Sequence, residues 1–238
     1  HLEMGNDNLA AAESEKLYSM TPEWVLAKNI FNGLVGRKVK VTNSNSEQII
    51  SFCLITKNEE KNLKRCLNSL SKIRHKEIII VDTGSTDKTL QIAKSYDAKI
   101  YHHTWTNNFS EARNKTLEFA RGDWLFFLDA DEELTSDALE TLKEDMAKPN
   151  ILGYRLPLEN IGSPLNGCNY VPRLVRNAPG LHFIGKIHET IHASVLVVMR
   201  QWNMEQIMGK TKILHHGYTP EELKRKNKLK RNLALYEE

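Results

Sequence analysis

The sequence is poor in the features that would place a protein in a membrane, on nucleic acid or in an oxidising compartment. We expect no transmembrane segment and no secretory signal, since no apolar run is long enough to span a bilayer. The three cysteines, Cys53, Cys66 and Cys168, have no metal-ligand spacing, and such a scattered, odd set is typical of reduced thiols in the cytoplasm. The net charge of only +3 gives little support for nucleic-acid binding. We therefore expect a cytoplasmic protein that binds no nucleic acid.

The sequence also lacks a phosphate-binding loop and an EF-hand calcium-binding loop. No glycine-rich, lysine-bearing phosphate loop follows the first predicted strand, which argues against a nucleotidyltransferase. The acidic cluster of Asp129, Asp131, Glu132 and Glu133 lacks the glycine and the distal glutamate of an EF-hand loop. A cation bound by these carboxylates would therefore occupy a different kind of site.

The helix signals divide the chain into three parts. Residues 1–47 combine a tag remnant with a short helical appendage that begins near Thr21-Pro22, an N-cap hydroxyl followed by proline. Residues 48–218 carry the strand and helix patterns of one folded domain. Thr219-Pro220 begins a further helix over 219–238 that has no stop signal, so we expect it to start a C-terminal helical region.

In the first half of the central domain, short apolar runs alternate with helical patterns. This order predicts an α/β, Rossmann-like fold with a mostly parallel central sheet and right-handed crossovers. The predicted strands are 49–55, 77–82, 99–101 and 123–128, and the predicted helices are 63–70, 90–96 and 109–120.

After Asp131 the pattern becomes looser. Glu132 and Glu133 favour the start of the next helix rather than chemistry, and that helix is predicted over 136–147. Later strands are predicted at 153–158, 173–176, 193–200 and 210–214.

Polar residues follow three of the predicted parallel strands. Asp129-Ala130-Asp131 directly follows the strand 123–128, and carboxylates at such a strand end can hold a hard divalent cation. Such a tripeptide is more often a surface turn, but its position after a buried strand favours a site. Asp82 ends its strand in the same way, with a turn or helix-cap role as the alternative. Thr56 and Glu59 follow the first strand, where helix capping is the alternative to nucleotide contact.

Four segments occur in order and at suitable spacing on these loops. They are Ile55-Thr56-Lys57-Asn58-Glu59, Val81-Asp82-Thr83-Gly84-Ser85-Thr86-Asp87, Phe109-Ser110-Glu111-Ala112-Arg113-Asn114 and Leu128-Asp129-Ala130-Asp131. Together they resemble the family 2 glycosyltransferases of the GT-A fold over roughly residues 48–218. Three later segments, Arg173-Leu174-Val175-Arg176, Phe183–Glu189 and His215–Tyr218, are most similar to the sublancin-type bacterial protein glycosyltransferases. Those enzymes modify cysteine, and sometimes serine, of bacteriocin-type peptides and carry C-terminal helical repeats.

The resemblance implies a donor site for a nucleotide sugar of the UDP-glucose or UDP-GlcNAc type. Asp82 would bind the uracil-type base, and Thr56 and Glu59 would line the nucleotide. Arg113 would lie near the diphosphate, where its fixed positive charge suits phosphate oxygens.

The resemblance also implies a metal site at the strand end. Asp129 and Ala130 would contact the nucleotide, Asp129 at the ribose or the metal, and Asp131 would ligate the metal. His215 would complete the site, although a His-His-Gly after a strand is more often a loop feature. Imidazole with carboxylate and phosphate oxygens suits Mn²⁺, and Mg²⁺ is the alternative.

The expected reaction is a metal-dependent, inverting transfer of a hexose to a cysteine or serine of a peptide. An attacking nucleophile must lose a proton, so Glu189, or else His188, is the candidate base; the alternative is that this pair orders a loop. The rival functions are transfer to a saccharide or lipid-linked acceptor, and a non-catalytic module that binds nucleotide sugar or peptide. The sequence does not decide whether the protein forms a homodimer.

Overall fold

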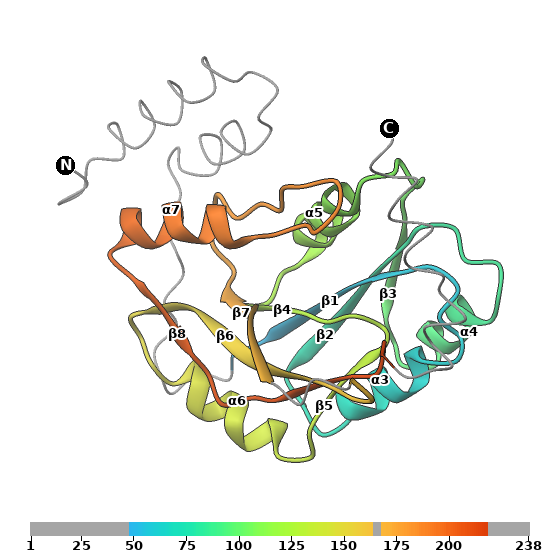
Figure 1. Cartoon of the computed structure of the whole chain (residues 1–238), viewed down its shortest axis with the longest axis horizontal. Helices are drawn as coiled ribbons and strands as arrows, with labels where there is room; N and C mark the ends of the chain where they lie inside the picture. Colours follow the sequence, from blue (N-terminus) through green and yellow to red (C-terminus); the bar gives the residue numbers. More distant parts are fainter. Residues whose placement is uncertain (1–47, 164–167, 219–238) are drawn as a thin grey trace.

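The computed structural model describes residues 48–163 and 168–218 (Figure 1). The helices expected within 1–47 and over 219–238 lie outside the described residues. The described residues all lie within the predicted central domain, 48–218.

The first half of the domain has the predicted alternation of strands and helices. Its four strands run parallel in the spatial order β3-β2-β1-β4, and the connecting helices form the crossovers. The strands are β1 (Ile50–Thr56), β2 (Lys76–Asp82), β3 (Lys99–His102) and β4 (Trp124–Phe127), and the helices are α3 (Leu63–Ser69), α4 (Thr89–Lys94) and α5 (Phe109–Phe119).

The second half extends the same sheet with strands of both directions. β4 pairs with β7 antiparallel, so this junction ends the parallel half of the sheet. The sheet continues as β7-β6-β9-β5, with β8 paired to β6. The elements are β5 (Glu132–Leu134), α6 (Ala138–Met146), β6 (Ile151–Asn160), β7 (Cys168–Arg176), α7 (His192–Trp202), β8 (Glu205–Met208) and β9 (Ile213–His215).

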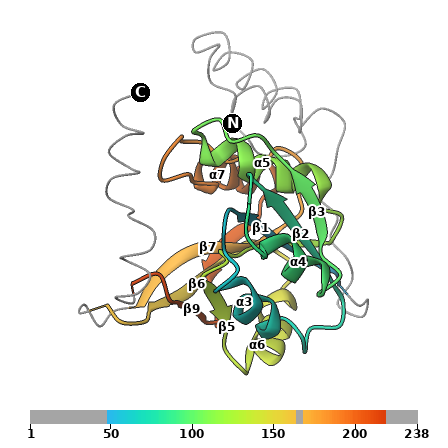
Figure 2. The ribbon, with the colours of Figure 1, turned by 90° about the vertical axis from the view of Figure 1, so that its right-hand side faces the viewer.

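Helices cover both faces of the sheet, as Figures 1 and 2 show, and the alternation of strand side chains explains why. On β1, Phe52 and Leu54 face the helices α3, α4 and α6, whereas Cys53 faces α5 and α7. All three side chains are fully buried. A strand buried on both faces is a near-continuous apolar run, which is the pattern that predicted the parallel sheet. The expected α/β fold is confirmed.

The prediction of a strand over 193–200 is wrong, because this segment lies within the helix α7. Its run of valines favours a strand by composition. However, the buried residues Ser194, Val195 and Val198 have helical spacing and pack on the sheet, while Leu196 is exposed. Asn203 ends the helix in the left-handed conformation, with φ of 48°. Tertiary packing has overridden the local preference for a strand.

Glu132 and Glu133 do not start a helix, which corrects a second prediction. They belong to β5, which pairs antiparallel with β9 so that Glu132 lies opposite His215. The next helix begins only at Ala138. The strand expected over 210–214 is shifted to Ile213–His215, and β8 was not predicted. The β5–β9 pairing matters for function because it brings the His215 segment to the end of β4.

Candidate active site

A pocket of about 590 Å³ lies at the carboxyl edge of the parallel strands. Its walls come from the segments after β1 and β4, from the start of α5, from the segment before α7 and from the end of β9. All the predicted site residues except Asp82 line it: Thr56, Glu59, Arg113, Asp129, Ala130, Asp131, His188, Glu189 and His215. The position of the pocket agrees with the rule that ligands of open α/β sheets bind beyond the carboxyl ends of the strands.

Asp82 does not line the pocket and is only 2% exposed. Its Oδ2 accepts the backbone N–H groups of Gly84, at 3.0 Å, and Ser85, at 2.9 Å, and its Oδ1 accepts the hydroxyl of Thr56 at 3.3 Å. Gly84 has φ of +101°, which this turn requires. The carboxylate of Asp82 therefore shapes the loop after β2, which is the turn role given above as the alternative. It contacts the pocket indirectly, through its hydrogen bond with Thr56.

The segment after β1, which lines the pocket, is hydrogen-bonded to the segment that follows β2. Asn58 has φ of 55°; its backbone N–H donates to Ser85 Oγ at 2.9 Å, and its Oδ1 accepts Thr86 N–H at 2.8 Å. The N–H of Glu59 donates to Thr89 Oγ1 at 2.7 Å. The Glu59 side chain accepts the Asn62 side-chain amide at 3.0 Å, next to the start of α3, where no side chain caps the helix. These bonds hold one wall of the pocket before any ligand binds.

Asp131 and His215 face each other in the pocket. The Nε2 of His215 lies 3.5 Å from Asp131 Oδ2, and Asp131 is only 4% exposed. The Nδ1 of His215 lies 2.8 Å from Asn160 Oδ1, and because that oxygen can only accept, Nδ1 carries a proton. Gly217 closes over the pair so tightly that a Cβ there would lie 2.8 Å from Asp131 Oδ2 and closer still to His215 Nε2.

The Asp131–His215 pair has the chemistry of a divalent metal site. A ligating histidine commonly donates its other ring N–H to an oxygen, as His215 does to Asn160. Over residues 48–163 and 168–218 no group of three His, Cys, Asp or Glu side chains is arranged to hold a metal. The two side chains would therefore share the ion with ligand oxygens or water, which is common for metals that bind substrate phosphates. The pair fits Mn²⁺ or Mg²⁺ on these terms.

Asp129 is held instead by two arginines. Its Oδ1 pairs with Arg113 Nη2, and its Oδ2 lies 3.1 Å from Arg173 Nη2. Burial would raise the pKa of Asp129, but the two guanidinium groups lower that pKa below its usual range. Both carboxylate oxygens are thus engaged, which favours Asp131 and His215 over Asp129 as ligands of a metal.

Two further members of this ion network were missed by the sequence interpretation. Glu132 accepts Arg173 Nη2 at 2.6 Å through one oxygen and the backbone N–H of Asp129 at 2.9 Å through the other. Burial raises the pKa of Glu132 to about 7, because Arg173 offsets it only in part. Arg173 appeared in a motif without a role. The available signal was an arginine at the start of the predicted strand 173–176.

The candidate base lies on a short loop before α7. Ile184 and Thr190 bridge the base of this loop, and His188 at its tip has φ of 55°, uncommon for a residue other than glycine. Glu189 Oε1 lies 3.3 Å from Arg113 Nε, so this carboxylate joins the ion network while still lining the pocket. Glu189 therefore lies closer to the charged centre of the site than the exposed His188.

An aromatic pair that lines the pocket was also missed. Trp105 and Phe109 line it with their rings in an edge-to-face arrangement, 4.8 Å between centroids. The signal was present in the sequence as two aromatic residues, Trp105 in the polar segment before α5 and Phe109 at the first position of that helix. They give the pocket an apolar surface on which a ring of a ligand can stack.

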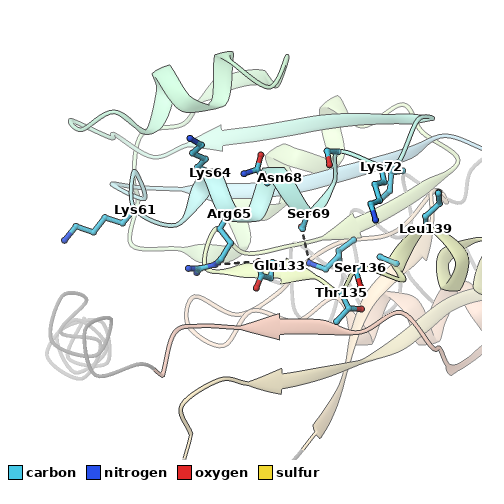
Figure 3. A pocket seen from close by; sticks show the side chains of 14 residues that line it. Lys61, Lys64, Arg65, Asn68, Ser69, Lys72, Glu133, Thr135, Ser136 and Leu139 are labelled. Atoms are coloured by element: carbon cyan, nitrogen blue, oxygen red, sulfur yellow. Dashed lines mark hydrogen bonds and ion pairs between the residues drawn. The ribbon is translucent and has the colours of Figure 1, made fainter.

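A second groove, of about 630 Å³, lies between α3 and the β5–α6 segment and is drawn in Figure 3. Its charged residues are Lys61, Lys64, Arg65, Lys72 and Glu133. In Figure 3, Lys61 and Lys64 point away from Glu133, which Arg65 approaches to 3.9 Å. None of the predicted site residues lines this groove, and its cations do not converge on one point. The pocket at the strand ends is the better candidate for chemistry.

A sheet covered by helices on both faces, with a carboxylate-bearing pocket at its parallel edge, defines an α/β domain of the GT-A class. Residues 51–196 match the Glycosyl transferase family 2 domain. The SPbeta prophage-derived glycosyltransferase SunS of Bacillus subtilis is 33% identical over 200 residues, which cover 79% of this chain and 44% of SunS. The chain belongs to glycosyl transferase family 2, as the resemblance implied.

Two solved structures have the same fold at low identity. S. aureus TarS 1-349 in complex with UDP-GlcNAc has a TM-score of 0.55 at 19% identity, over 71% of this chain and 59% of the TarS 1-349 chain. Glucosyl-3-phosphoglycerate synthase from Mycobacterium tuberculosis, in complex with Mn²⁺, UDP and phosphoglyceric acid, has a TM-score of 0.54 at 16% identity, over 81% of this chain and 80% of that one. The chain spans about half the length of the curated relatives it matches, SunS among them. Within the described residues, no helix has the length and apolarity needed to cross a membrane.

Proposed function

We propose that this domain transfers a hexose from a UDP-sugar, of the UDP-glucose or UDP-GlcNAc type, to a cysteine or serine of a peptide. The transfer inverts the anomeric carbon and uses Mn²⁺ or Mg²⁺. The observation that carries the proposal is the convergence of Asp131, His215 and Arg113 on one pocket at the parallel edge of a GT-A sheet. Solved structures of this fold contain UDP-GlcNAc, or UDP with Mn²⁺, which supports the donor and the metal. The similarity to SunS supports the peptide acceptor.

The leaving group sets the first chemical demand on the site. As the anomeric bond breaks, negative charge develops on the nucleoside diphosphate. A divalent cation held by Asp131 and His215 would supply Lewis-acid stabilisation of that charge. Arg113 is fixed by Asp129 and Glu189, so its guanidinium is preorganised and needs little reorientation during the reaction.

The acceptor sets the second demand, because its thiol or hydroxyl must lose a proton. Glu189 is the proposed base, since it lines the pocket beside Arg113, and His188 is the alternative. A thiol ionises near pH 8.5 and needs less help than a hydroxyl. The proposed dependence on Glu189 is therefore stronger for a serine acceptor than for a cysteine acceptor.

The test is mass spectrometry of candidate peptides incubated with a panel of nucleotide sugars and Mn²⁺. The mass shift identifies the sugar, and fragmentation identifies the modified atom. Asp131→Ala is expected to abolish metal-dependent donor binding and transfer, while Asp137→Ala, at an exposed position, is the matched control. Metal-dependent turnover that survives Asp131→Ala contradicts the site assignment. Tight donor binding without turnover on any acceptor would support a non-catalytic module instead.

The cytoplasmic location stays part of the proposal. Its basis is the cysteine usage of the sequence; Cys53 and Cys66 are buried thiols, and Cys168 is an exposed one. Burial raises the pKa of the Cys53 thiol to about 12.

A further inference from the structure

A smaller cavity of about 200 Å³ adjoins the main pocket and shares Arg113, Asp129 and Glu189 with it. We call it the side chamber. Its remaining polar wall includes Arg173 on β7. Its apolar wall includes Phe127, Val171, Phe183 and Ile191. The two cavities thus meet at the ion network around Asp129.

A β-bulge aims Arg173 at the side chamber. The β6–β7 register passes from Tyr154 opposite Leu174 to Arg155 opposite Pro172, so Arg173 is the extra residue on β7. Bulges re-aim a side chain and are common beside active sites. The side chain of Arg173 is 16% exposed, and its Nη2 reaches both Asp129 and Glu132. Without the bulge, the side chain of Arg173 would follow the regular alternation of side chains along β7.

Each arginine of the chamber has a buried N–H group without a partner among the described residues. They are Nη1 of Arg113 and Nε of Arg173. The Arg113 side chain is only 4% exposed, so water gives it little compensation. Buried donors without partners are unusual in proteins, so the two arginines have hydrogen-bonding capacity that their carboxylate partners do not use.

The charge of the chamber selects the class of ligand. Arg113 and Arg173 face Asp129 and Glu189, so its charged wall has two positive and two negative groups. An anion would be repelled by the carboxylates, and a cation would be repelled by the guanidinium groups. A neutral polyol accepts hydrogen bonds from the arginines and donates to the carboxylates, and its C–H faces can pack on Phe127 and Phe183, whose rings meet edge to face.

We propose that the side chamber holds the neutral hexose ring of the donor and that Arg173 is a specificity-determining residue that binds its hydroxyl groups. The inference rests on the proposed function, because the diphosphate would occupy the adjoining pocket at Asp131, His215 and Arg113. The chamber thereby separates recognition of the sugar from recognition of UDP.

The experiment compares the affinities of UDP, UDP-glucose and UDP-GlcNAc by calorimetry with Mn²⁺ present. Val171→Phe fills the chamber and leaves the ion network intact. Arg173→Ala removes the guanidinium group that would donate hydrogen bonds to the sugar. For the sugar that wild type prefers, each variant is expected to raise the ratio of the UDP-sugar Kd to the UDP Kd at least tenfold. Arg155→Ala, at an exposed arginine on β6 that donates to Tyr170 O, is the matched control and should keep the wild-type ratio.

The outcomes separate the two proposals. An unchanged ratio in Val171→Phe, or an equal loss of UDP and UDP-sugar affinity in both variants, overturns the assignment of the chamber and leaves the UDP site standing. Failure of the wild-type protein to bind either UDP or a UDP-sugar overturns the proposed function and the chamber together. Because Val171→Phe removes no charge, it tests the chamber even if Arg173→Ala fails to fold.

Discussion

Asn160 Oδ1 lies 2.8 Å from His215 Nδ1, on the side of the ring opposite to Asp131. The two residues come from neighbouring parallel strands, β6 and β9, at a register where they lie directly opposite each other. The amide fixes the tautomer of the ring and leaves Nε2 for the pocket. Asn160 therefore has a role that its own sequence context does not reveal: it orients the proposed metal ligand without lining the pocket.

Asn160→Ala is expected to weaken Mn²⁺ binding about 10- to 100-fold, which is the usual loss when the partner of a ligating histidine is removed. The measurement is a Mn²⁺ titration in the presence of UDP. Asn160→Asp keeps an acceptor for Nδ1 and should restore most of the affinity. Asn150→Ala, at an exposed position between α6 and β6, is the control. Equal Mn²⁺ affinity in wild type and Asn160→Ala would show that His215 is not a ligand oriented in this way.

Gly217→Ala tests the close packing over the same pair. The added Cβ would lie 2.8 Å from Asp131 Oδ2, so one of the two side chains must move. We expect Mn²⁺-dependent UDP binding to fall at least about tenfold, because a ligand displaced by a fraction of an ångström no longer shares the ion. The melting temperature provides the control: a change confined to the site lowers affinity with little effect on unfolding. An unaltered UDP affinity would mean that the segment after β9 adjusts freely.

Glu189→Gln removes the proposed base while keeping its size. Transfer to a serine acceptor is expected to fall about 10²- to 10⁴-fold, the usual contribution of a general base. The UDP affinity should change little. Glu140→Gln, at an exposed position on α6, is the matched control. Transfer rates are measured at several pH values with serine and cysteine peptides, and the cysteine peptide should recover with rising pH as its thiol ionises. Full activity of Glu189→Gln on the serine peptide at neutral pH would exclude Glu189 as the base.

The strand ends of the parallel half were predictable because each signal was local. The buried runs of β1, β2 and β4 are continuous in sequence, and the polar residues after β1 and β4 fall at one edge of any parallel sheet. The contacts around Arg173 were not predictable in this way. They depend on a bulge in the pairing of β7 with β6, which only the assembled sheet defines.

The helix α7 shows where a local sequence signal predicts the wrong element. Its valines favour a strand when considered alone, and the packing that makes them helical comes from the far face of the sheet. His215 was implied by a family motif, but its approach to Asp131 requires β9 to pair with both β5 and β6. Long-range pairing, rather than local propensity, therefore assembles the Asp131–His215 side of the pocket.

His182 gives the fold a pH dependence that can be measured apart from catalysis. Burial lowers the pKa of His182 to about 4, and its Nε2 lies 3.0 Å from the Asn114 amide. In the unfolded chain a histidine titrates near pH ~6.5. As the pH falls from about 6.5 towards 4, the unfolded state takes up a proton that the folded state refuses, so stability is lost with acidification and regained as pH rises.

His182→Gln should flatten this dependence by removing up to about one proton of uptake on unfolding. The free energy of unfolding is measured by chemical denaturation at intervals between pH 4.5 and 8 for wild type and variant. His75→Gln, at an exposed histidine, is the control and should keep the wild-type slope. If wild type and His182→Gln lose stability in parallel as the pH falls, the buried neutral ring of His182 is not the source of the acid sensitivity.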